Sequence, residues 1–145
     1  MFNELFKVMY MARFTRTAQI LLSTGVAVLD TLKISGNAIG NVIVEKSVLN
    51  AAEKVKSGRP LSEALRDQPY ILQMVIQMAA IGEQSGKMDE MLGKAAQIYE
   101  DELDAKIAAI STMIEPVLMI MLAGMAAVLV GGFLFPIYSI VNKVG

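Results

Sequence analysis

The chain has 145 residues, of which 54% are hydrophobic and 19% are charged, and its formal net charge is −1. This length suits one domain with a modest core, and the near balance of charge leaves no basic footprint for nucleic acid. The sequence contains no Cys and no His. It therefore excludes disulfides, thiolate metal sites and cysteine nucleophiles, and it lacks the commonest general base.

The part of the chain before Pro116 has the apolar spacing of helices and no alternation typical of strands. After a lead-in segment over residues 1–12, the pattern predicts helices at 13–24, 26–35, 42–57, 61–66 and 71–84. Local signals set several of these limits. Asn41 is a suitable N-cap, Gly58 closes the third helix, and Pro60 suits the first turn of the fourth.

The stretch Ile81–Met88, IGEQSGKM, looks at first like a phosphate-binding loop. That motif needs G-x-x-x-x-G-K-[ST] after a buried strand. Here the glycines are one residue too close, Met88 replaces the hydroxyl, and no strand precedes them. We therefore predict a tight corner between the fifth and sixth helices, built from Gly82, Glu83, Ser85 and Gly86. Gly86 supplies its left-handed residue, and Glu83 and Ser85 are expected to satisfy exposed helix-end groups there.

The sixth helix is the longest, because apolar residues recur at helical spacing from Met88 to Ile114. Residues 116–141 then contain no charged side chain and exceed the roughly 20 apolar residues that cross a bilayer. The sequence thus predicts an all-α protein. A six-helix bundle over residues 13–115 is followed by a C-terminal transmembrane helix over 116–141 and a tail over 142–145. Since only Pro116 interrupts the sixth helix and the span, the two can form one long kinked rod.

Small residues line one face of the predicted span, where Ala123, Ala127 and Gly131 are spaced by four. Such a stripe lets another helix approach closely, although lipid-facing helices also tolerate glycine. Glu115 stands directly before Pro116 at the edge of the span, and its carboxylate either reaches headgroup level or contacts a neighbouring segment. Pro136 is expected to kink or end the helix near its far end.

The carboxylates of the bundle are the candidates for metal binding or catalysis. The acidic run Glu100–Asp104 has the oxygen ligands that calcium or magnesium prefers, but it lacks the loop carbonyls and glycine of a calcium-binding hand. A solvated helix face is therefore the preferred interpretation. Glu63, Glu83 and Asp89 have no nucleophile or base beside them in the sequence. The sequence predicts no catalytic residue, no cofactor and no metal.

Several motifs together resemble the family of type II secretion F proteins and type IV pilus inner-membrane platform proteins. The chain is similar to the second repeat of that family from Ala12 to about Val141. No single motif is specific, but their combination is. The matching pieces are ARFTRTAQILLSTGVAVLDTL (Ala12–Leu32), the Asn41 turn, VKSGRPLSEAL (Val55–Leu65), QMAAIGEQSGKMDEML (Gln77–Leu92), YEDELD (Tyr99–Asp104), IEPVLMIMLAG (Ile114–Gly124) and Pro136.

The resemblance implies a helical bundle in the cytoplasm, attached to the bacterial inner membrane and acting as a non-enzymatic assembly platform. Its implied partners are a cytoplasmic hexameric ATPase, a pilin or pseudopilin, other inner-membrane platform proteins, membrane lipid and further copies of the chain in a homo-oligomer. Members usually carry two repeats and about three spans, so this sequence represents a fragment, a shortened relative, or one of two chains that together supply both repeats.

Two interpretations from other classes remain open at this stage. One is a membrane-anchored helical scaffold with no motor partner. The other is a small transporter or channel subunit, which a single span disfavours unless the chain oligomerises.

Overall fold

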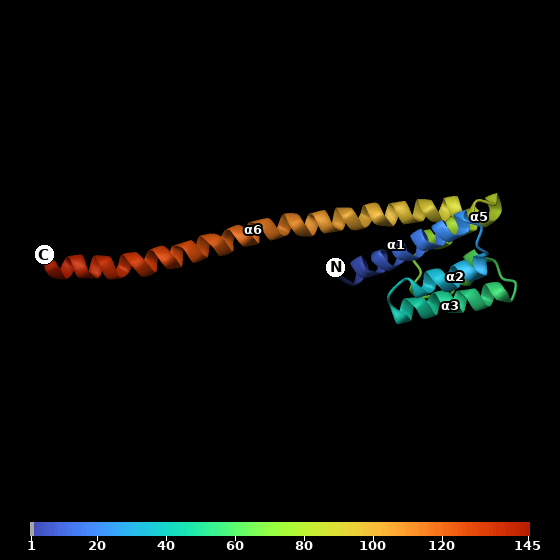
Figure 1. The fold of residues 1–145 in the computed structure, drawn as a ribbon, viewed down its shortest axis with the longest axis horizontal. Coiled ribbons are helices and arrows are strands. Elements are labelled where there is room, and N and C mark those ends of the chain that lie inside the picture. Colours follow the sequence, from blue (N-terminus) through green and yellow to red (C-terminus); the bar gives the residue numbers. More distant parts are fainter. Residues whose placement is uncertain (1) are drawn as a thin grey trace. The chain divides into compact units, whose positions relative to one another are not determined.

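The computed structural model describes residues 2–145, which form six α-helices and no β-strand (Figure 1). Its internal contacts divide the chain into two compact units that meet between Ala105 and Lys106. The predicted all-α class is confirmed. The helices are α1 (Phe2–Ser23), α2 (Val28–Asn37), α3 (Val42–Lys56), α4 (Leu61–Arg66), α5 (Gln73–Ser85) and α6 (Met88–Val144).

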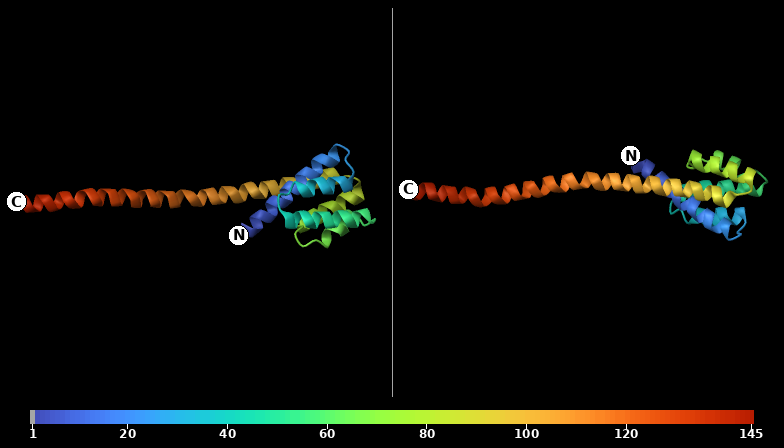
Figure 2. Two further views of the ribbon diagram at one scale, coloured as in Figure 1. Left: turned by 60° about the horizontal axis from the view of Figure 1, so that its bottom comes forward. Right: turned by 90° about the horizontal axis from the view of Figure 1, so that it is seen from above.

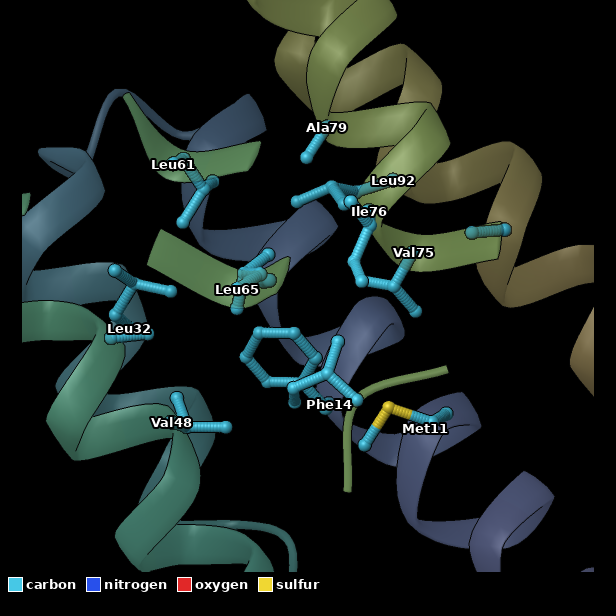
Figure 3. Packing of buried hydrophobic residues seen from close by; sticks show 14 of the residues in the cluster. Met11, Phe14, Leu32, Val48, Leu61, Leu65, Val75, Ile76, Ala79 and Leu92 are labelled. Carbon is cyan, nitrogen blue, oxygen red and sulfur yellow. The ribbon is translucent and has the colours of Figure 1, made fainter. Parts of the chain in front are cut away.

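The core of the first unit lies where the inner faces of the helices meet (Figure 3). Burial of these apolar side chains is the main favourable contribution to folding. Tyr99 is buried in the same core, and its burial, with the negative charge of Glu102 nearby, raises the pKa of its hydroxyl to about 12. The largest fully buried hydrophobic side chains are Met11, Phe14, Leu32, Ile39, Val48, Leu65, Val75 and Leu92.

The local signals in the sequence fix several helix ends. The side-chain oxygen of Asn41 accepts hydrogen bonds from the backbone N–H groups of Ile43 at 2.9 Å and Val44 at 3.2 Å, which confirms the predicted N-cap of α3. Gly58 follows α3 with φ +99°, a conformation that glycine adopts without the steric cost of a Cβ. Pro60 directly precedes α4, whose predicted limits agree with the structure.

The helix α1 begins at Phe2 and not at Arg13 as predicted. Val8, Met11 and Ala12 are buried in the core, so packing extends the helix toward the N-terminus beyond the segment with the clearest apolar spacing. Smaller differences occur at α2 and α5, each of which begins two residues after its predicted start. Helix limits commonly shift by this amount because end turns fray.

The helix α6 continues through both Pro116 and Pro136 to Val144. The sixth helix and the span are therefore one continuous helix, as predicted, and Pro136 does not end it. Each proline lacks the N–H that would bond the carbonyl four residues earlier. Near the first of them the Thr112 hydroxyl donates to the carbonyl of Ala108 at 2.9 Å, a back-bond that often accompanies helix bending.

We expect Phe14→Ala to lower the free energy of unfolding by about 3–5 kcal/mol, because it removes a buried ring and leaves a cavity. Phe14 is 1% exposed, whereas Phe6, on the same helix, is 47% exposed. The control Phe6→Ala should have a much smaller effect. Chemical denaturation of the full chain in detergent, followed by circular dichroism, compares the two, and equal losses would contradict the placement of Phe14 in the core.

Candidate functional site

The corner between α5 and α6 is built by two glycines with different roles. Gly86 adopts φ +69° and its backbone N–H bonds the carbonyl of Gly82, which closes α5. A Cβ on Gly82 would lie only 2.8 Å from the Cα of Met88. The first turn of α6 therefore packs against the backbone of α5 at a distance that only glycine permits.

The two polar residues of this corner serve different helix ends. The Ser85 hydroxyl donates to the carbonyl of Ile81 at 2.8 Å, in the last turn of α5. The Glu83 carboxylate, which the sequence placed at the corner itself, instead accepts from the backbone N–H of Ser62 at 3.1 Å and from its hydroxyl at 2.6 Å. Pro60, at the N-cap of α4, offers no side-chain cap. Glu83 thus supplies that cap from another helix, where a negative charge is favourable.

A bidentate ion pair joins α1 to α6. Arg16 donates from Nε to Oε1 of Glu100 at 2.8 Å and from Nη2 to Oε2 at 2.7 Å, and its Nη1 donates to Gln19 at 3.1 Å. The hydrogen bonds from Arg16, with its positive charge, lower the pKa of Glu100, and the pair raises the pKa of Arg16. Glu100 belongs to the acidic run that was predicted to be a solvated helix face. The ion pair leaves no local signal in the sequence, because its two residues are 84 positions apart.

A pocket of about 360 Å³ lies beside this ion pair. Arg13 lies on its wall and donates from Nη1 to the carbonyl of Ile39 at 3.5 Å, a long hydrogen bond. The described residues 2–145 contain no group of three His, Cys, Asp or Glu side chains placed to hold a metal ion. The pocket is lined by Met9, Ala12, Arg13, Arg16, Thr17, Ala38, Glu100 and Leu103.

The second unit, Lys106–Gly145, consists of the C-terminal part of α6 and Gly145, and its residues from Ser111 onward are exposed. Within residues 2–145, α6 is the one helix long and apolar enough to cross a membrane. Ala123, Ala127 and Gly131 are exposed on it, and so is Glu115. A Cβ on Gly131 would meet no atom of the chain within 4 Å. These residues are therefore available to lipid or to another helix.

The fold defines a class: a helical bundle that carries an apolar helix long enough to span a membrane. Residues 14–136 match the family model described as type II secretion system (T2SS), protein F. The chain belongs to this family.

Relatives from both pilus and secretion systems align with most of the chain. The type IV pilus assembly protein PilC of Myxococcus xanthus is 36% identical over 143 residues, which are 99% of this chain and 34% of that protein. PilC of Thermus thermophilus is 37% identical, covering 97% and 35%. The type II secretion system protein F of Pseudomonas aeruginosa is 35% identical, covering 92% and 33%. The chain thus spans about a third of the length of these relatives.

We expect Gly82→Ala to destabilise the bundle by about 1–3 kcal/mol. The new methyl group would clash with the Cα of Met88, and this backbone atom can move away only if the first turn of α6 moves with it. The matched control is Gly93→Ala, also within a helix. There the added Cβ would lie 3.0 Å from Cγ of Gln19, a flexible side chain that can turn aside, and alanine improves helix propensity. Urea denaturation of both variants measures the difference. Equal stabilities would contradict the close packing of the corner.

We expect Arg16→Ala to raise the pKa of Glu100 toward its ordinary value of 4.5. The ion pair stabilises the fold at pH values above 4.5, the ordinary pKa of the carboxyl group. Its contribution is lost as the pH falls through the pKa that Glu100 has in the folded protein, which is lower. Because both side chains are about one-third exposed, solvent screening keeps the contribution small. Carboxyl ¹³C NMR titration measures the pKa. Arg13→Ala, which removes a neighbouring cation outside the pair, should leave it nearly unchanged.

Proposed function

We propose that this protein is part of the inner-membrane assembly platform of a type IV pilus or type II secretion system. Membership of the protein F family is the observation that carries the proposal. The names of the aligned relatives refer to pilus assembly and to type II secretion, and the chain has a helix able to span a membrane. Its role is structural, without a catalytic step of its own.

In this proposal residues 116–141 cross the bacterial inner membrane and the bundle lies in the cytoplasm. The bundle binds the cytoplasmic ATPase of the system and neighbouring platform proteins, including further copies of the chain. The span binds lipid and packs against a pilin or pseudopilin helix or against another platform helix. The continuous helix α6 supports this role, because hydrogen-bonded helix can transmit displacement where a flexible loop cannot. Adenosine triphosphate is hydrolysed by the partner.

The small-residue face of the span provides the test of the packing role. Replacing Ala127 and Gly131 by Leu should abolish pilus assembly or secretion, because the bulkier side chains keep a partner helix from approaching. The bundle should stay folded, since a Cβ at Gly131 meets no atom of its own chain. The measurement is complementation of a deletion strain, with protein level and circular dichroism recorded beside it.

The matched control for the face compares two single substitutions. Gly131→Leu changes the face itself, and Gly132→Leu makes the same change one residue along the helix. Gly132→Leu places its side chain about 100° around the helix axis from that of Gly131, also in open space. It should complement far better than Gly131→Leu does. Full assembly by the Ala127→Leu, Gly131→Leu variant would remove this face from the mechanism.

Binding of the ATPase separates this proposal from a membrane-anchored scaffold without a motor. If the platform role is correct, the purified full chain in lipid nanodiscs co-purifies with the ATPase of the same system. A chain that supports assembly without ever binding the ATPase would favour the simpler scaffold.

A further inference from the structure

Apolar side chains are exposed at the connection between α2 and α3. Val42 is 78% exposed and Ile43 is 57% exposed, and both lie in the first turn of α3. Ala38, the C-cap residue of α2, is exposed as well. We call Ala38, Val42 and Ile43 the apolar tip. Single exposed apolar residues are common on proteins, whereas a group of them can mark a surface that binds a membrane or another protein.

The backbone holds the apolar tip in place. The N–H of Ile43 bonds the side-chain oxygen of Asn41 at 2.9 Å, and Gly40 turns the chain with φ +81°. On the side toward α1, Arg13 donates to the carbonyl of Ile39. The tip is therefore exposed on ordered backbone, which loses little conformational freedom when it binds.

The apolar tip lies at the end of the first unit where α6 leaves it. In Figure 1 and in both views of Figure 2, the α2–α3 connection is at the opposite end of this unit from the α5–α6 corner. Ala38 also shares the wall of a pocket with Leu103, two residues before the unit ends at Ala105. The N-terminal part of α1, in which Phe6 is 47% exposed, lies at the same end. Exposed apolar side chains of several helices are therefore found where the chain continues toward its apolar segment.

The apolar part of α6 begins directly beyond the first unit. Residues 107–141 contain one charged side chain, Glu115, and Ile107, Met113 and Ile114 are exposed. At about 1.5 Å per residue, this stretch is longer than the ~40–45 Å of a bilayer with its headgroups. Transmembrane helices tilt by up to about 40°, and a tilt brings the start of the stretch into the headgroup layer. The end of the first unit that carries the apolar tip then comes close to the lipid surface.

The chemistry of the apolar tip suits lipid better than a protein partner. Protein interfaces draw most of their binding energy from Trp, Tyr and Arg, and valine is under-represented among their strongest contacts. The tip offers small and branched aliphatic side chains, whose transfer from water into an apolar environment is favourable without a matching shape. Charge contributes little, because Lys46 follows Ile43 by one turn and Glu45 stands next to Lys46.

We propose that the apolar tip inserts into the membrane interface and so attaches the first unit to the lipid surface. The ligand is phospholipid, bound at the boundary between headgroups and acyl chains and not through headgroup charge. A span alone leaves the first unit free to tilt, whereas a second contact with lipid limits its orientation. The inference rests on the proposed function in one respect, that residues 116–141 cross the membrane.

The experiment uses the full chain in phosphatidylcholine nanodiscs, with and without bromine on the acyl chains close to the headgroup. Because the chain contains no Trp, each variant carries a single emitter. Ile43→Trp reports on the tip. The matched control is Ile81→Trp, at a position 46% exposed in the last turn of α5, and Leu129→Trp reports on the span. Circular dichroism checks folding, and Val42→Trp repeats the measurement if Ile43→Trp is misfolded.

Brominated lipid should quench the emission of the Ile43→Trp variant roughly twofold, because interfacial apolar groups lie about 5–10 Å into the boundary between headgroups and acyl chains. The Leu129→Trp variant should also be quenched, and the Ile81→Trp variant should not.

Quenching of Leu129→Trp without quenching of Ile43→Trp would overturn the inference and leave the membrane crossing intact. Equal quenching of Ile43→Trp and Ile81→Trp would overturn it too, because the tip would then have no special contact with lipid. Emission of Ile43→Trp at shorter wavelength without quenching would show that protein covers the tip, which contradicts a lipid contact. An unquenched Leu129→Trp variant would overturn the membrane crossing and the inference together.

Discussion

The approach of Gly82 to Met88 sets the geometry on which the rest of the bundle depends. A Cβ on residue 82 would lie 2.8 Å from the Cα of Met88, so this close approach requires glycine at that position. With α5 and α6 held this close, Leu92 and Tyr99 reach the core and Glu100 comes within bidentate distance of Arg16 on α1. The α5–α6 corner, the buried residues of α6 and the ion pair to α1 therefore together hold α6 against the other helices of the first unit.

Contacts between distant segments tie the short helices to this corner. The helix α4 has only six residues, too few to be stable in isolation. The core holds it through Leu61, Ala64 and Leu65, and Glu83 caps it from the end of α5. A single carboxylate near the corner thus orders the start of α4.

The features that the sequence predicts correctly are those with a local signal. Asn41, Pro60 and Gly86 act on backbone within a few residues of themselves, so the ends of α3, α4 and α5 could be placed closely. The apolar run of α6 was equally plain. The N-terminal half of α1 was missed, because its helix depends on burying Val8 and Met11 against other helices. The partners of Glu83 and Glu100 were missed for the same reason: Ser62 and Arg16 are distant in sequence, and no local pattern identifies them.

The unbroken course of α6 from Met88 to Val144 makes the length of the chain a constraint in its own right. Each residue added to or removed from a helix turns everything beyond it by about 100° and shifts it by about 1.5 Å. One extra residue between Ala127 and Gly131 would turn the side chain at the Gly131 end about 100° away from the face that Ala123 and Ala127 share. Insertions of about 7, 11 or 18 residues would nearly restore the face. Homologues should accordingly differ in sequence along this stretch far more readily than in the number of residues it contains.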